Sequence, residues 1–162
     1  LPIARWAPLA GRILADMVKQ AWCIALLLLV GALLGYRTSE PLGWVLVMVA
    51  LLLVFALAMS WVMVLVGVLA KDPEHVQLFG FTALFPVTFV SNVFVPLETL
   101  PPLMQSAVQA NPVSLLTQAS RGLLNGGPAL EPALWSLVWA VVITAVFAPL
   151  SVWALNRRLA RS

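Results

Sequence analysis

Four long apolar runs, separated by short polar segments, dominate the pattern of hydrophobic and polar positions along the chain. They cover residues 18–36, 42–70, 76–95 and 133–155. Each run is close to or above the roughly 20 residues that a helix needs to cross the hydrocarbon core of a bilayer. None alternates apolar with polar residues, as the strands of a membrane barrel do. Because a helix satisfies its backbone hydrogen bonds within its own segment, the pattern predicts an all-α polytopic membrane protein with four transmembrane helices.

The composition of the chain favours the same class. Hydrophobic residues make up 62% of the sequence and charged residues 9%, and the mean hydropathy is +1.03. Soluble domains carry about 25% charged residues. The single cysteine, Cys23, lies inside the first run and has no partner for an intrachain disulfide. Because the sequence begins with Leu1 and lacks the basic and apolar regions of a signal peptide, we expect it to be part of a longer protein.

The distribution of charge is more informative than the net charge of +3. With four spans, both ends of the chain and the loop that contains Lys71 lie on one side of the membrane. Seven of the nine lysines and arginines fall on that side, and only Arg37 and Arg121 fall on the other. The positive-inside rule therefore predicts that both ends are cytoplasmic. Since the basic residues flank membrane spans, we expect membrane lipid, and no nucleic acid, as a partner.

The segment before the first span, residues 1–17, predicts an amphipathic helix from about Leu9. The apolar residues Leu9, Ile13, Leu14 and Met17 share one face, and Arg12, Asp16 and Lys19 lie on the opposite face. Two interpretations remain open. The charged residues are a flank that anchors the next span by reaching the interface, or they form a docking helix for a cytoplasmic partner.

Proline and polar residues interrupt the third apolar run. Pro86 lies inside it, and proline within a helix removes one backbone hydrogen bond and favours a kink. Ser91 and Asn92 follow near its end. An asparagine in hydrocarbon is costly unless it bonds to another helix or faces a wet cavity, so a structural and a functional role both remain open.

The segment 97–131 predicts two short outer helices before the last span. Thr99 fits an N-cap for the first, with prolines in its first turn. Asn111 fits the N-cap of the second, and Pro112 its first helical position. Gly126 and the residues after it stop this helix. The apolar stripe of the second helix consists of Leu115, Leu116, Ala119 and Leu123. Such helices either lie at the interface or are re-entrant, and both arrangements remain open.

The chain lacks the residues that carry catalysis or metal binding. No pair of carboxylates and no serine, histidine and aspartate set lies in or beside the runs. His75 is the only histidine and has no second ligand nearby. A glycine-rich phosphate-binding loop is also missing. We therefore expect no catalytic residue, no metal site and no cofactor bound by this chain, and any energy for transport has to come from elsewhere.

A set of motif residues runs through the third span and the outer segment. In order, they are Phe89, Ser91-Asn92, Phe94-Val95-Pro96, Glu98, Pro101, Asn111-Pro112 and Arg121-Gly122-Leu123. In order and spacing these residues resemble a known family, the membrane subunits of ABC-2 type exporters in the branch typified by the daunorubicin-resistance permease. A looser resemblance extends over the whole chain, and Leu100 stands where the branch more often has Met.

The resemblance implies that residues 1–162 are the C-terminal part of an ABC-2 transmembrane domain, the last four of six helices. It implies a separate ATP-binding cassette subunit that uses ATP and Mg, a second permease subunit in a homo- or heterodimer, and location in the plasma membrane. The segment 1–17 would be the coupling helix on the ATPase, and the outer helices would be re-entrant. The implied coupling residues are Arg5, Arg12, Asp16 and Lys19. The implied residues of the translocation path or outer gate are Phe89, Ser91, Asn92, Phe94, Pro96, Glu98, Asn111, Pro112 and Arg121, with Glu98 and Arg121 as candidates for an ion pair.

Two hypotheses of function follow. The first is an export permease that moves a hydrophobic or amphiphilic compound, a drug or a lipid, with energy from the ATPase. The second is a non-transporting membrane scaffold or assembly protein that binds a partner through its outer helices. An ATP-binding cassette protein encoded beside this one favours the first hypothesis, and its absence favours the second.

Overall fold

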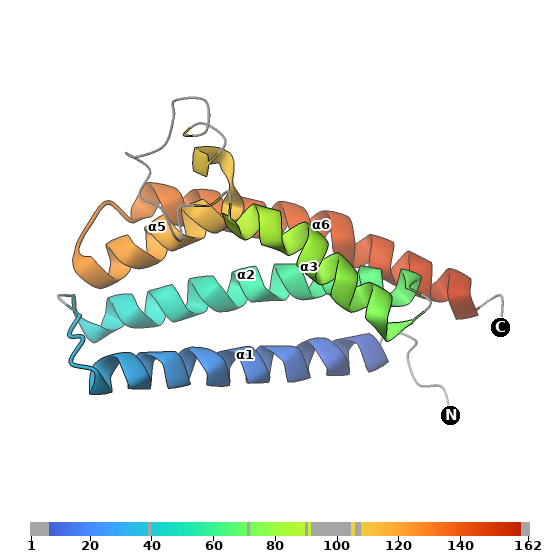
Figure 1. Cartoon of the computed structure of the whole chain (residues 1–162), viewed down its shortest axis with the longest axis horizontal. Helices are drawn as coiled ribbons and strands as arrows, with labels where there is room; N and C mark the ends of the chain where they lie inside the picture. The colour runs from blue at the N-terminus through green and yellow to red at the C-terminus, as the bar shows by residue number, and fades with distance from the viewer. Residues whose placement is uncertain are drawn as a thin grey trace.

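The computed structural model describes residues 7–38, 40–70, 72–89, 91, 105 and 108–159, and this part of the chain contains helices and no strand (Figure 1). The helices in chain order are α1 (Ala7–Leu33), α2 (Leu42–Leu69), α3 (Pro73–Phe89), α5 (Pro112–Asn125) and α6 (Leu130–Leu159). The predicted all-α fold class is therefore confirmed.

Three helices in the described residues are long and apolar enough to cross a membrane. They are the segments Ala10–Leu33, Leu42–Leu69 and Leu130–Arg158, and they correspond to the first, second and fourth predicted spans. The helix at the third predicted span, α3, has 17 residues. Residues 92–95 of that predicted span lie outside the described part of the chain, so the fourth crossing stays a prediction.

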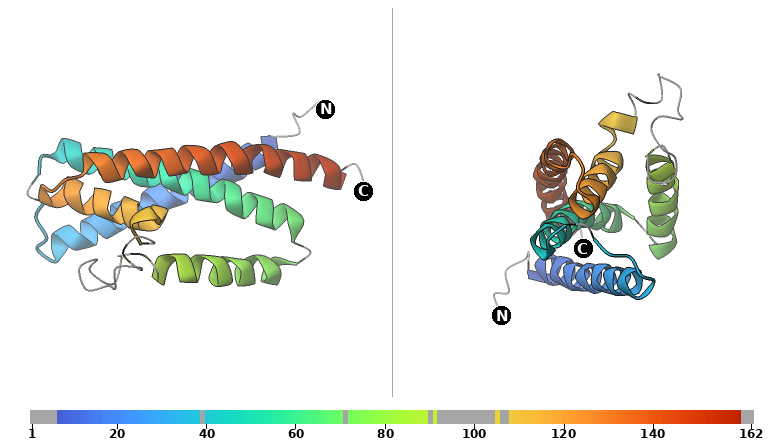
Figure 2. Two further views of the ribbon diagram at one scale, coloured as in Figure 1. Left: turned by 90° about the horizontal axis from the view of Figure 1, so that it is seen from above. Right: turned by 90° about the vertical axis from the view of Figure 1, so that its left-hand side faces the viewer.

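The long helices lie side by side. Helix α1 runs in the opposite direction to α2, whereas α2 and α6 run in the same direction (Figures 1 and 2). Figures 1 and 2 show α1 running from one end of the bundle to the other, α2 returning beside it, and α6 running along α2. The start of α1, the α2–α3 turn and the end of α6 share one end, here called the charged end. The α1–α2 and α5–α6 turns share the opposite end, here called the turn end. The side of the membrane that each end faces stays a prediction.

Helix α1 is one continuous helix across the boundary that we predicted between a coupling helix, 1–17, and a span, 18–36. It ends at Leu33, three residues before the predicted end. Gly35, with a φ of 90°, ends the helix, because the amide of Tyr36 bonds back to the carbonyl of Gly31 at 3.0 Å. This is the glycine-terminated motif that satisfies the last carbonyls of a helix. The sequence signal for a separate helix was the change from mixed to apolar residues, which requires no break in the backbone.

Helix α2 is the centre of the bundle, and it packs against α1, α3, α5 and α6. Its contact with α6 includes small residues, since Ala58 and Ala140 are both buried beside Phe55. Small side chains let membrane helices approach closely, which increases the van der Waals contact that holds them together. Near the charged end, Ile13 of α1 and Val64 of α2 form a second cluster.

Polar groups join α2 and α6 near the charged end. The hydroxyl of Ser151 lies 2.7 Å from the carbonyl oxygen of Phe147 in its own helix and 3.2 Å from that of Trp61 in α2. The guanidinium of Arg158 donates to the carbonyl oxygen of Val68 at 2.9 Å. That carbonyl belongs to the last turn of α2, where helices leave acceptors unsatisfied and favour positive charge. Arg158 therefore caps α2.

Candidate functional site

Helix α5 has the ends that the sequence predicted for the second outer helix. Asn111 adopts an extended backbone with a ψ of 124°, and its side-chain oxygen accepts a hydrogen bond from the amide of Val113 at 2.9 Å. Pro112 is the first helical residue. At the other end, Gly126 has a φ of 77° and donates to the carbonyl of Gly122 at 3.0 Å. The predicted N-cap and stop signal are both confirmed.

The apolar stripe of α5 faces protein. Ala119 and Leu123 are buried against Met48 and Leu51 of α2, and α5 also packs on α6. Both figures show α5 running along the bundle, from a point partway along it to the turn end, instead of lying across its end (Figures 1 and 2). The core contacts of α5 therefore come from the neighbouring helices.

The start of α5 is tied to the end of α3, and Asn111 makes the link. Its side-chain amide nitrogen donates to the carbonyl oxygen of Val87 at 2.8 Å. That carbonyl lacks the regular helical bond from Ser91, four residues on, because the amide of Ser91 bonds instead to Thr88 at 3.2 Å. One asparagine thus satisfies an orphan acceptor at the end of α3 and an orphan donor at the start of α5. We call this contact the α3–α5 junction.

Two other predicted path residues lie beside the junction. The ring of Phe89 stacks on that of Phe85, with centroids 4.2 Å apart. Ser91 is buried, and its hydroxyl donates to the carbonyl oxygen of Thr88 at 2.5 Å. This bond closes the last turn of α3 beside the junction, and a role of Ser91 in the translocation path stays a prediction.

The remaining predicted path and gate residues are distributed as follows. Arg121 is exposed near the far end of α5. It lies nine residues from Pro112, or about 14 Å along the helix, so it does not belong to the junction. Asn92, Phe94, Pro96 and Glu98 lie outside the described residues, and so does the proposed pairing of Glu98 with Arg121.

A second contact, at the turn end, holds the α1–α2 turn against the end of α5. The hydroxyl of Thr38 donates to the carbonyl oxygen of Leu124 at 2.8 Å, and the hydroxyl of Tyr36 donates to the side-chain oxygen of Asn125 at 2.5 Å. Sequence reasoning missed this contact, because 86 or more positions separate the partners. The signal that could have found this contact is the pair of glycines, Gly35 and Gly126, each of which ends a helix. With four spans, the two turns that contain these glycines lie on the same side of the membrane.

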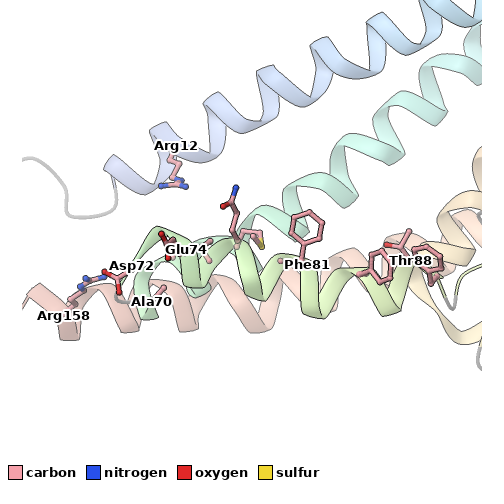
Figure 3. Close-up of a pocket in the computed structure, with 14 residues that line it drawn as sticks. Arg12, Ala70, Asp72, Glu74, Phe81, Thr88 and Arg158 are labelled. Atoms are coloured by element: carbon pink, nitrogen blue, oxygen red, sulfur yellow. The ribbon is translucent and has the colours of Figure 1, made fainter.

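An open groove of about 930 Å³ lies near the charged end. Figure 3 shows Arg12 of α1 facing the α2–α3 turn across this groove, with Asp72 and Glu74 on the turn and Arg158 on α6. Phe81, Phe85 and Phe89 of α3 line its apolar part. The groove therefore combines charges of both signs at its mouth with aromatic side chains along its wall.

The predicted coupling residues lie on the first turns of α1. Arg12, Asp16 and Lys19 are all exposed, and Arg5 lies outside the described residues. Of the three that are described, Arg12 lines the groove. On the opposite face, Ile13 is buried in a cluster with Val64 of α2, and Met17 packs against that cluster. Leu14, which the amphipathic pattern placed on the same face, is exposed instead.

Comparisons with known proteins agree with the pattern of spans and motifs. The ABC-2 type transporter family matches residues 1–125, which extend from the start of the chain to the end of α5. The daunorubicin resistance ABC transporter permease protein DrrB1 of Streptomyces coeruleorubidus is 36% identical over 152 residues, which is 94% of this chain and 54% of that protein. The probable doxorubicin resistance ABC transporter permease protein DrrC of Mycobacterium tuberculosis is 31% identical over 156 residues, which is 94% of this chain and 55% of that protein.

The chain thus spans about half the length of the curated relatives it matches. No solved structure matches it. The family match covers more than three quarters of the chain and includes α1, α2, α3, α5 and the junction that Asn111 makes. The chain belongs to the ABC-2 type transporter family.

Proposed function

We propose that this protein is a permease subunit of an ATP-binding cassette exporter, which moves a hydrophobic or amphiphilic compound out across the plasma membrane. The observation that carries the proposal is its similarity, over 94% of the chain, to permease subunits named for resistance to daunorubicin and doxorubicin. Both names point to an amphiphilic drug as cargo, and a lipid is the alternative cargo of the same class. ATP and Mg would be bound by a separate subunit, because the described residues of this chain contain no phosphate-binding loop.

The test is transport by the full-length protein together with the ATP-binding cassette protein encoded beside it. Both are reconstituted in vesicles, and daunorubicin movement and ATP hydrolysis are measured together. We expect daunorubicin to stimulate hydrolysis and to accumulate only with ATP present. If neither occurs with daunorubicin or with lipid cargo, the exporter proposal is wrong and the scaffold hypothesis gains.

We further propose that the charged face of α1 is the coupling surface for the ATPase. Arg12, Asp16 and Lys19 are exposed at the end of the bundle that the positive-inside rule assigns to the cytoplasm. Arg5 would belong to the same surface. Mixed charges on an exposed helix face favour a complementary partner and set its orientation.

Reversing two of these charges tests the coupling surface. We expect Arg12→Glu combined with Asp16→Arg to lower recovery of the ATPase with the permease by about tenfold, because like charges then face each other across the contact. The matched control is Arg37→Glu, at the opposite end of the bundle, which should leave recovery unchanged. Equal recovery from the double variant and the control would contradict the assignment. The measurement is the amount of ATPase that copurifies with full-length permease.

The α3–α5 junction is the part of the outer gate that the described residues support. We propose that α5 is re-entrant, because it runs along α2 and α6 and buries its stripe against them. A re-entrant helix is tolerated at membrane depth where protein surrounds it. Asn111, Pro112 and Phe89 would then lie at the boundary between α3 and the outer gate. A second permease subunit, the same or related, would complete the path.

A further inference from the structure

The groove at the charged end has charges of both signs at its mouth. Arg12, Asp72, Glu74 and Arg158 line it from three different parts of the fold (Figure 3). Arg12 and Glu74 form no ion pair within the described residues. Asp72 lies 3.6 Å from the imidazole of His75. Arg158 uses one nitrogen on the carbonyl of Val68, and a guanidinium has further donors to offer.

The wall of the groove is apolar and aromatic. Phe81, Phe85 and Phe89 follow one another at four-residue spacing, which places them on one face of α3. Gly67 of α2 and Gly80 of α3 also line the groove. A methyl group built on Gly67 would meet nothing within 4 Å, so the groove is open there. These residues leave a channel of apolar surface that no described side chain fills.

This surface is longer than one leaflet of a bilayer core is thick. From Glu74 to Phe89, α3 rises by about 22 Å. Half of a hydrocarbon core is about 15 Å. A molecule with its head at Glu74 therefore has room for an acyl chain along the wall.

The mouth of the groove lies at the depth of the lipid headgroups. Trp153 is exposed near the end of α6, and the guanidinium of Arg157 lies 4.6 Å from the centre of its ring. Exposed tryptophans with nearby arginines mark the membrane–water interface. Arg158, next in sequence to Arg157, belongs to the mouth. The charged residues of the groove are thus level with the interface.

We propose that this groove binds a zwitterionic phospholipid of the phosphatidylethanolamine class. The phosphate would lie between Arg12 and Arg158, and the primary ammonium would donate to the carboxylates of Asp72 and Glu74. One acyl chain would lie on the phenylalanine wall. An anionic lipid would bring its negative headgroup beside two carboxylates, and a cationic amphiphile would bring its charge beside two guanidinium groups. The zwitterion satisfies both pairs.

The test uses full-length protein reconstituted in vesicles of equal parts phosphatidylethanolamine and phosphatidylglycerol with the same acyl chains. The protein is extracted in detergent, and the lipid that stays bound is measured by native mass spectrometry. We expect phosphatidylethanolamine to be retained several-fold over phosphatidylglycerol. Gly67→Leu should lower the retained phosphatidylethanolamine by about tenfold, because the added side chain fills the groove. Gly43→Leu, on the same helix but outside the groove, should retain as much as the unchanged protein.

A second variant tests the role of the charges. Glu74→Gln removes one carboxylate and should shift the retained lipid towards phosphatidylglycerol, whereas a purely structural role would lower both lipids equally. Equal retention of both lipids by the unchanged protein would overturn the proposal, and so would normal retention by Gly67→Leu. Neither measurement requires ATP hydrolysis, so the outcome is independent of the proposed export activity.

Discussion

Replacing Asn111 with alanine is expected to destabilise the full-length protein by about 2 kcal/mol, because one side chain makes two bonds that alanine cannot make. Loss of an N-cap costs about 1 kcal/mol. Loss of the hydrogen bond to the carbonyl of Val87 adds about 1 kcal/mol, the net contribution of a typical hydrogen bond. The measurement is the midpoint of thermal unfolding in detergent, with transport measured in parallel.

Asn111→Asp separates the two bonds. Aspartate is as good an N-cap as asparagine, and its negative charge is favourable at a helix start. It lacks the amide that donates to Val87 at 2.8 Å. We therefore expect its unfolding midpoint to lie between those of Asn111→Ala and the unchanged protein. If aspartate is as stabilising as asparagine, the link to α3 contributes nothing. If alanine is as stabilising, the junction itself is wrong.

The ends of α5 could be predicted from the sequence because the signals are local. Asn111 and Pro112 are adjacent, and the cap bond spans only two residues. Gly126 adopts the left-handed conformation that glycine permits most readily. Local chemistry of this kind fixes where a helix begins and ends, whatever surrounds it. The three long apolar helices were predictable for a similar reason, since length and hydropathy alone define them.

The partners of these residues could not be predicted in the same way. The second bond of Asn111 reaches Val87, 24 positions earlier, and a single sequence contains no signal that pairs the two. The same holds for Thr38 and Leu124 at the turn end. Apolar residues are an equally poor guide, because Leu14 is exposed while Ile13 beside it is buried. In a membrane chain both lipid-facing and protein-facing positions are apolar, so the pattern does not separate them.

The predicted path residues show that a sequence motif and the three-dimensional structure group residues differently. The family motif groups Ser91, Asn111 and Arg121 as one set. In the structure, Ser91 and Asn111 meet at the junction, whereas Arg121 lies at the other end of α5. The spacing between Asn111 and Arg121 predicted a helix from one to the other. It did not predict the direction of that helix relative to α2 and α6. That direction depends on the burial of Ala119 and Leu123 against α2.

Replacing Gly122 with alanine is expected to destabilise the protein, although alanine is the better helix former. A Cβ at Gly122 would lie 2.9 Å from the Cβ and 3.1 Å from the Cα of Ala129. Ala129 cannot move away easily, because its carbonyl accepts the amide of Ala133 in the first turn of α6 at 3.0 Å. Overpacking of this kind costs about 1–3 kcal/mol, against a gain of up to about 1 kcal/mol from helix propensity. Gly122→Val should cost more, since its side chain is larger and β-branched.

The matched control for Gly122 is Gly43, which is also helical but has open space around it. A Cβ there would meet nothing within 4 Å, so Gly43→Ala should leave stability unchanged or raise it by up to about 1 kcal/mol. If the α5–α6 turn folds back onto Gly122, thermal unfolding should therefore show a loss of stability for Gly122→Ala and no loss for Gly43→Ala. A stabilising effect at both positions would mean that α6 begins farther from α5 than described, and the contact between the end of α5 and the start of α6 would be wrong. Asn111 lies at the N-terminal end of the same helix, so a shift of α5 away from α6 would also displace the α3–α5 junction. We therefore expect Gly122→Val to lower export even where the protein still reaches the membrane.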